Sequence, residues 1–196
     1  MSRPISKDWI DAYFDRGIDV TNRRIFLWGS IDEDTVSNVV KGIYLMDSKS
    51  NKDPIELFIS SEGGDLNEAF GLYDVIQTVT CPISTFAVGK CFSAAPLLVA
   101  CGAKGDRWTG NNCCFMIHQP WQEIEGGRRI DELSKEINAS EETKKRWAKL
   151  MERHTNKAQA FWLKECAKTG EQYFDATKAV EYGIVDMVWV ERGADK

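Results

Sequence analysis

Hydrophobic residues along the chain alternate between short apolar runs and longer segments in which they recur every three or four positions. Arg24–Gly29 is an apolar run that ends at a glycine, which is typical of a buried strand. Val36, Val39 and Ile43 then follow at the spacing of one helix face. Ile55–Ile59 is a second apolar run. The opening of the chain therefore predicts a strand, a helix and a strand, the pattern of a parallel α/β unit.

The same alternation continues through the middle of the chain. Leu66–Ile76 carries an amphipathic helical stripe, and Pro82–Val88 is a third apolar run. Ala94–Ala100 has the composition of a buried helix, and Cys113–Ile117 is a fourth predicted strand. Strands separated by helices favour a parallel sheet, whose sites assemble where the strands end.

Longer helical patterns fill most of the remaining chain. Arg128–Lys168 is a long helical region that follows a short extended segment, Gln122–Gly127. A long amphipathic helix outside a sheet core usually packs on a partner. The chain then closes with a short helix at Ala176–Tyr182, Gly183 as its C-cap and a last strand, Ile184–Val190. Near the start, Ile10, Tyr13 and Phe14 have the spacing of one face of a further short helix.

Composition and charge exclude several classes of function. The chain has 196 residues, 43% of them hydrophobic, which suits one domain with a real core. A net charge of -5 provides no basic surface for nucleic acid or anionic lipid. We find no apolar stretch long enough to span a membrane and no secretion signal at the start. The six cysteines show no metal-ligand spacing, so we expect no metal, reduced thiols and a cytoplasmic location.

A serine and a histidine are the candidate chemical groups. Ser93 stands directly before the predicted helix Ala94–Ala100, where Pro96 is tolerated only in the first turn. His118 follows the fourth predicted strand, and histidine is the usual base that activates a serine hydroxyl. Each residue also has a structural interpretation: Ser93 as a helix cap and His118 as a strand-end histidine. The other histidine, His154, lies in a polar helical stretch and is expected to be a solvated surface residue.

Two glycines follow the second predicted strand in the motif SEGGD. Gly63 and Gly64 would let backbone N–H groups face a ligand, although a lone pair of glycines is more often a plain tight turn. The pattern GxxxxGK[ST] is absent, which excludes a phosphate loop.

Six segments together carry a family resemblance: SEGGD, GKCFSAA, CGAKGDR, MIHQP, MERHT and AVEYGIVD. From about Arg24 to Val190, the chain resembles the proteolytic subunit of the Clp protease, the ClpP family. The resemblance implies a serine endopeptidase in which Ser93 is the nucleophile and His118 the general base. The backbone N–H groups of Gly64 and Ala94 would form the oxyanion hole.

The resemblance also implies an architecture and partners. The implied fold is α/β, a ClpP/crotonase-like ββα superhelix with a protruding helical handle, in one domain spanning 1–196. Its parts would be an N-terminal segment (1–22), a head (23–122 and 171–190) and the handle (123–168). Seven subunits would form a ring, and two rings would stack through the handles. An AAA+ unfoldase would feed polypeptide substrates into the chamber, and no cofactor is needed.

The chain departs from the family pattern at three places. Counting back from Gly183, the position of the catalytic aspartate is occupied by Glu171, and Asp175 is the alternative acid. Ala94 replaces the usual methionine after the nucleophile, which keeps the backbone donor but changes the lining of the first subsite. The N-terminal segment is short and lacks the usual pore-lining loop, so docking to an unfoldase is a weaker implication than cleavage.

Two other functions remain compatible with the sequence. The acid substitution at Glu171 would also suit a non-catalytic ring subunit that assembles with an active paralogue. An acyl-CoA enzyme of the crotonase-like fold would share the oxyanion hole, but enolate chemistry does not need a serine–histidine pair.

Overall fold

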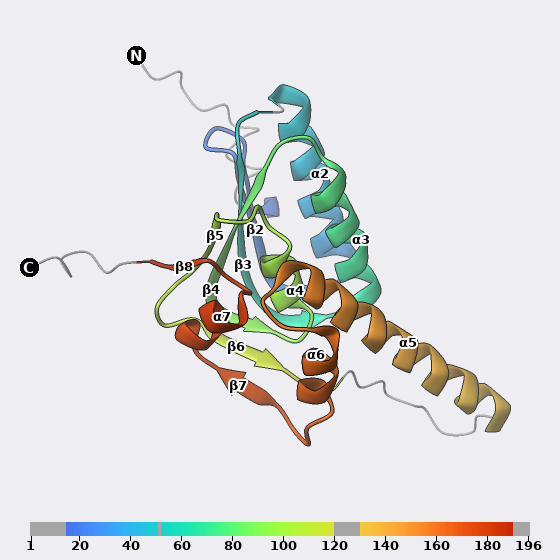
Figure 1. The fold of residues 1–196 in the computed structure, drawn as a ribbon. Coiled ribbons are helices and arrows are strands. Elements are labelled where there is room, and N and C mark those ends of the chain that lie inside the picture. Colours follow the sequence, from blue (N-terminus) through green and yellow to red (C-terminus); the bar gives the residue numbers. More distant parts are fainter. Residues whose placement is uncertain (1–14, 51, 120–129, 190–196) are drawn as a thin grey trace, which may run out of the picture.

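The computed structural model describes residues 15–50, 52–119 and 130–189 (Figure 1). The helix predicted around Ile10, Tyr13 and Phe14 and the extended segment Gln122–Gly127 lie outside these residues. Within them the chain forms a mixed α/β fold, as predicted.

The described part of the chain is centred on a mostly parallel sheet with the strand order β1-β2-β3-β4-β5-β8. These strands are β1 (Ile18–Asp19), β2 (Arg24–Ile31), β3 (Ile55–Gly64), β4 (Ile83–Phe92), β5 (Arg107–Thr109) and β8 (Met187–Val188). Only the β1–β2 pair is antiparallel along this path. The predicted parallel unit at the start of the chain is therefore confirmed.

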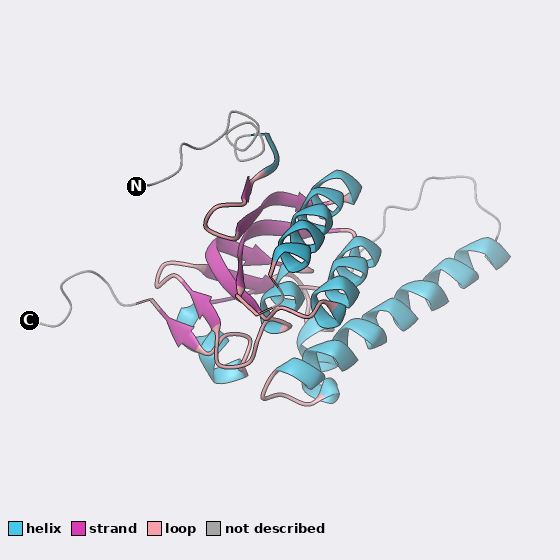
Figure 2. Ribbon diagram, turned by 90° about the horizontal axis from the view of Figure 1, so that it is seen from above, coloured by secondary structure: helices cyan, strands magenta, loops and turns pink. Residues whose placement is uncertain are grey.

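Three helices cover one face of the sheet: α2 (Glu33–Lys49), α3 (Leu66–Thr78) and α4 (Ala95–Ala100) (Figure 2). α2 begins where Asp32 accepts a hydrogen bond from the Thr35 N–H at 2.9 Å. Beneath these helices, Leu27, Leu57 and Ile59 are fully buried. Burial of these alternating strand residues removes apolar surface from water and fixes which face of the sheet the helices cover.

The opposite face carries a row of aromatic rings. Phe26, Phe58, Phe86 and Trp108 lie in register on β2, β3, β4 and β5. Their neighbouring ring centroids are 5.2, 4.7 and 6.5 Å apart. Trp189 packs on Phe86 at 5.7 Å. Each of these side chains keeps part of its surface exposed, so this row is an aromatic surface rather than a core.

β4 bends in its middle and pairs with two parallel neighbours in succession. Thr85–Ala87 pairs with β5, whereas Lys90–Phe92 pairs with β6 (Cys114–Ile117). Gly89 lies between these two parts with a φ of 69°, a left-handed conformation that glycine adopts without steric cost. The prediction that the strand ends at Val88 was therefore wrong, because a glycine in this conformation bends the strand without ending it.

The second half of the chain adds a short antiparallel strand and three helices. β7 (Gln172–Phe174) pairs with β6 and was not predicted. α5 (Ile130–His154) projects from the body of the molecule (Figure 1), and α6 (Gln159–Cys166) follows it. The predicted helical region is thus broken after His154. α7 (Ala176–Tyr182) ends at Gly183, whose φ of 77° confirms the predicted C-cap.

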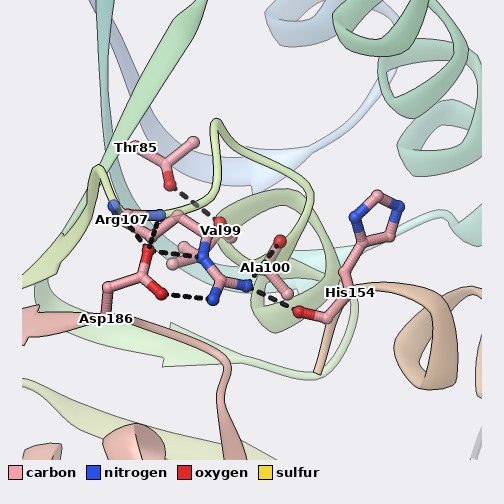
Figure 3. A network of polar contacts seen from close by, with 7 residues as sticks. Thr85, Val99, Ala100, Arg107, His154 and Asp186 are labelled. Carbon is pink, nitrogen blue, oxygen red and sulfur yellow. Dashed lines mark hydrogen bonds and ion pairs between the residues drawn. The ribbon is translucent and has the colours of Figure 1, made fainter. Parts of the chain in front are cut away.

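A buried ion pair joins the C-terminal ends of two helices to the sheet (Figure 3). Arg107 is 4% exposed and forms an ion pair with Asp186 at 2.5 Å. Its Nη1 donates to the backbone oxygen of Ala100, the last residue of α4, at 3.0 Å and to that of His154 at 2.6 Å. Burial alone would raise the pKa of Asp186, but the hydrogen bond and charge of Arg107 outweigh it and hold that pKa below its ordinary value.

His154 is not the solvated surface residue that the sequence indicates. Its side chain is half-buried at the end of α5, and its Nε2 lies 2.9 Å from the Tyr73 hydroxyl oxygen. Desolvation, with the charges of Arg153 and Arg107, lowers the pKa of His154 to about 4. The sequence neighbours of His154 are polar, but in the folded chain its side chain contacts Tyr73 on α3.

All six cysteines are free thiols. Five of them are buried, and Cys114 on β6 is partly exposed. Burial raises the pKa of the Cys81 and Cys113 thiols to about 11 and that of Cys166 to about 12. These buried thiols therefore stay protonated near neutral pH, and a protonated thiol is a poor nucleophile.

Candidate active site

Ser93 and His118 meet where two neighbouring parallel strands end. Ser93 directly follows β4 and His118 directly follows β6. The N–H of Ser93 donates to the Met116 backbone oxygen at 2.8 Å, which continues the pairing of the two strands. His118 Nε2 lies 2.8 Å from Ser93 Oγ. This is the distance at which an imidazole can take the proton of a hydroxyl.

The backbone holds the Ser93 side chain in an unusual conformation. The φ of Ser93 is 58°, in the left-handed region that residues with a Cβ seldom adopt. Gly63, at the end of β3, packs against this turn so closely that a Cβ built on it would lie 2.6 Å from the Ser93 Cβ. The motif SEGGD thus supplies a glycine where no side chain fits beside the serine.

The two residues expected to supply the oxyanion hole each adjoin a residue of the contact between Gly63 and Ser93. Gly64 ends β3 with a φ of 152° and lines the cavity at the site. Ala94 is fully buried as the N-cap of α4, and its N–H donates to no acceptor among the hydrogen bonds of the described residues. The Gly63–Gly64 pair is not the plain turn considered above, because β3 runs through both residues and Asp65 caps α3.

A cavity of about 770 Å³ opens beside this pair. Four of the five predicted site residues line it, namely Ser93, His118, Gly64 and Glu171. Ala94 does not line it. The cavity also reaches α5 and α6. Its volume is large enough for part of a polypeptide chain rather than a single small group.

The two candidate acids have other partners. Glu171 accepts a hydrogen bond from the Tyr173 hydroxyl, and this bond raises the pKa of Tyr173. Asp175 caps α7 by accepting from the Lys178 N–H at 2.9 Å, and it lines a second cavity that contains neither Ser93 nor His118. Within the described ranges, no hydrogen bond joins either carboxylate to His118. The role of Glu171 stays a prediction.

Sequence reasoning missed the wall of the cavity that α5 provides. Ala139, Ser140, Thr143 and Trp147 line it from one face of that helix, and Cys166 from α6. The helical region predicted over Arg128–Lys168 was expected to pack on a partner, not to line a cavity. Ser140 and Thr143, two polar residues on the helix face that carries Trp147, were the signal in the sequence that this face lines a cavity.

The described part of the chain contains no cluster of three histidine, cysteine or acidic residues placed to hold a metal ion. None of its helices combines the length and the apolar character that crossing a bilayer requires.

Known proteins place the chain in one family. The model of the Clp protease family matches residues 12–192. The chain is 33% identical over 174 residues to the ATP-dependent Clp protease proteolytic subunit 4, chloroplastic, of Arabidopsis thaliana, a match that covers 88% of this chain and 58% of that protein. It is 31% identical over 174 residues to the ATP-dependent Clp protease proteolytic subunit 1 of Rhodopirellula baltica, covering 84% of this chain and 71% of that protein. This chain belongs to the Clp protease family, the proteolytic subunits known as ClpP.

Proposed function

We propose that this chain is a serine endopeptidase that hydrolyses peptide bonds through an acyl-enzyme. The contact of 2.8 Å between Ser93 Oγ and His118 Nε2 carries the proposal, because it joins a nucleophile to a base inside a cavity of about 770 Å³. Membership of the Clp protease family supports the same chemistry.

The reaction would follow from the positions of these groups. His118 takes the proton of Ser93 as the serine oxygen attacks the carbonyl carbon of the substrate. The N–H groups of Gly64 and Ala94 stabilise the negative charge on the carbonyl oxygen, and each such donor typically contributes about 10²–10³ in turnover. His118 then gives its proton to the leaving amine. Water, activated by the same imidazole, releases the acyl part and restores Ser93.

Glu171 is the acid that we propose to orient His118. It lines the same cavity as His118, whereas Asp175 lines another. To reach the imidazole, Glu171 would exchange its hydrogen bond with Tyr173 for one with Nδ1 of His118.

The present partner of Glu171 also favours a second candidate function. If Glu171 stays bonded to Tyr173, His118 lacks this acid, and the chain would be a non-catalytic subunit of an assembly. The two candidates differ in whether Ser93 is reactive.

We propose that the chain works in an assembly of stacked rings, with an ATP-dependent unfoldase as a partner. The names of both relatives describe them as proteolytic subunits of an ATP-dependent protease. The projecting α5 and the aromatic row Phe26, Phe58, Phe86 and Trp108 are the surfaces that support association. A cytoplasmic location stays a prediction, and the name of the Arabidopsis relative assigns that protein to the chloroplast.

A fluorophosphonate probe and a fluorogenic peptide test the activity directly. We expect the probe to label the assembled protein on Ser93 and the peptide to be cleaved. Ser93→Ala should abolish both, whereas Ser48→Ala, which changes an exposed serine on α2, should change neither. Cleavage by Ser93→Ala at the normal rate would end the proposal. An assembled protein with no adduct on Ser93 would establish the non-catalytic subunit.

A further inference from the structure

A tyrosine in the wall of the active-site cavity binds one of the two candidate acids. The Tyr173 hydroxyl donates a hydrogen bond to the Glu171 carboxylate, and both residues line the cavity that contains Ser93 and His118. This bond raises the pKa of Tyr173, so the hydroxyl stays protonated and remains a donor near neutral pH. The acid that the proposed reaction needs therefore has a second partner beside the site.

The pairing of β6 with β7 places Glu171 within reach of His118. The two strands are antiparallel, and Ile117 faces Gln172 in their last paired position. His118 and Glu171 each occupy the next position, so the register, continued by one residue, puts them opposite each other. Side chains opposite each other on such strands lie on one face with their Cβ atoms about 4.5–5.5 Å apart. The cavity agrees with this register, because it is lined by His118 and Glu171 but not by the pair before them.

Glu171 has to lean in different directions to reach its two possible partners. His118 lies across the strand pair with its Nε2 at 2.8 Å from Ser93 Oγ, which leaves Nδ1 as the nitrogen for the acid. Tyr173 lies two residues further on the same strand face, about 7 Å along the strand. A carboxylate that leans along the strand to the tyrosine is drawn away from the residue opposite. Among the hydrogen bonds of the described residues, Glu171 bonds to Tyr173 and not to His118.

The tyrosine ring has a defined place on the sheet. It packs edge-on against Phe92, with ring centroids 5.7 Å apart, and Phe92 is the last residue of β4 before Ser93. The backbone of Tyr173 pairs opposite Met116 on β6. Tyr173 is 57% exposed, so water can replace either partner of its bond to Glu171. The bond therefore restrains the acid without locking it.

We propose that Tyr173 is a positioning residue that restrains Glu171 away from His118 and thereby lowers the turnover of the peptidase. The inference rests on the proposed function, because it takes Glu171 as the acid of the reaction. When the bond to Tyr173 opens, the carboxylate is free to accept from Nδ1 of His118, where it stabilises the imidazolium that forms during catalysis. Tyr173 thus sets the fraction of molecules in which the acid is in use.

Removal of one oxygen atom tests the restraint. Tyr173→Phe keeps the ring that packs on Phe92 and deletes only the donor. We expect kcat to rise about threefold to tenfold with KM unchanged, the factor that corresponds to the net contribution of one hydrogen bond. The gain belongs to kcat because Glu171 acts on His118 in the transition state rather than on bound substrate. Tyr44→Phe, which changes an exposed tyrosine on α2, should alter neither constant.

A double-mutant cycle shows whether the effect passes through Glu171. In the Glu171→Ala background, Tyr173→Phe should produce no gain, because no carboxylate remains to be released. An unchanged or lower kcat in Tyr173→Phe, or an equal gain in the background without Glu171, would overturn the inference.

A crystal structure of Tyr173→Phe separates this inference from the proposed function. We expect the Glu171 carboxylate within hydrogen-bond distance of His118 Nδ1, a result that needs no turnover. If neither the unaltered protein nor the variant cleaves peptides but the carboxylate has moved to His118, the peptidase fails and the restraint stands. A carboxylate that stays away from His118 in the variant would refute the restraint, whatever the activity.

Discussion

Ser93 has a backbone conformation that is rare for a residue with a side chain. Its left-handed backbone costs on the order of 1–3 kcal/mol, and such conformations persist only where the surroundings enforce them. Two contacts enforce it here: the hydrogen bond from its N–H to the Met116 oxygen and the close approach of Gly63. The backbone conformation thereby helps to place the serine hydroxyl beside His118.

Gly63 is therefore expected to be indispensable for activity. In Gly63→Ala the new Cβ would lie 2.6 Å from the Ser93 Cβ and 2.8 Å from the Phe92 oxygen, and the φ of 92° is itself unfavourable for alanine. Because these neighbours belong to the turn that presents Ser93, we expect kcat/KM to fall about 100-fold or more, the loss that small misplacements of reacting groups produce.

Gly71 on α3 provides the matched control. A Cβ there would meet nothing within 4 Å, and the residue lies inside a helix. Gly71→Ala should raise the free energy of unfolding by about 0.5–1 kcal/mol and leave kcat/KM unchanged. Equal activity of the two variants would contradict the steric role of Gly63.

His154 should make the stability of the protein depend on pH in a defined window. The folded pKa is about 4, below the ordinary value of 6.5, because burial and the charges of Arg153 and Arg107 disfavour the imidazolium. Between these values the unfolded state binds more protons, so stability present above pH 6.5 is lost as the pH falls toward 4. His154→Gln, which can still bond to the Tyr73 hydroxyl, should flatten this part of the curve. Urea unfolding at several pH values measures it, and an unchanged slope would contradict the assignment.

At the scale of the elements, Arg107 ties α4 to the rest of the fold. α4 carries Ala94 at its start, and Arg107 holds the backbone oxygen of Ala100 at its end while it also binds Asp186 and the His154 oxygen (Figure 3). The position of the helix that begins beside the nucleophile therefore depends on a cation at its other end.

Removal of one partner of this ion pair should lower the free energy of unfolding. Arg107→Met leaves the Asp186 carboxylate partly buried without its cation, and we expect a loss of about 3–5 kcal/mol in the free energy of unfolding. The double variant with Asp186→Asn should lose less, because no uncompensated charge then remains. A loss in Arg107→Met below about 1 kcal/mol in denaturant titrations would show that water replaces the guanidinium.

The elements that the sequence predicted well are those whose apolar pattern is long. α2 and α3 and the buried parts of β2 and β3 follow directly from the spacing of residues such as Val39 and Ile59. β5 and β7, with three residues each, are too short to carry a pattern, and the bend of β4 at Gly89 resembles a turn. The partner of His154, Tyr73, comes from a distant segment, so no local pattern could indicate it.

Part of the site could be predicted because its residues stand at the ends of elements with a clear apolar pattern. Ser93 and His118 each stand where a predicted strand or helix begins or ends, and parallel strands bring such ends together. The resemblance to the Clp protease family supplied their roles together with those of Gly64 and Ala94, and the match over residues 12–192 confirms the family. Trp147 lies in the predicted helical region Arg128–Lys168, but no local pattern could indicate its place in the wall of the cavity.

At the scale of the whole molecule, the burial of the cysteines has a practical consequence. Cys114 is the one thiol that is not buried, and it lies on β6, the strand that His118 directly follows. A maleimide dye added to the native protein should therefore attach at a single position, as peptide mass mapping would show, and Cys114→Ser should stay unlabelled. The chain thus offers one attachment point for an optical label without any substitution, and modification of several thiols in the folded state would mean that the interior opens more readily than its packing indicates.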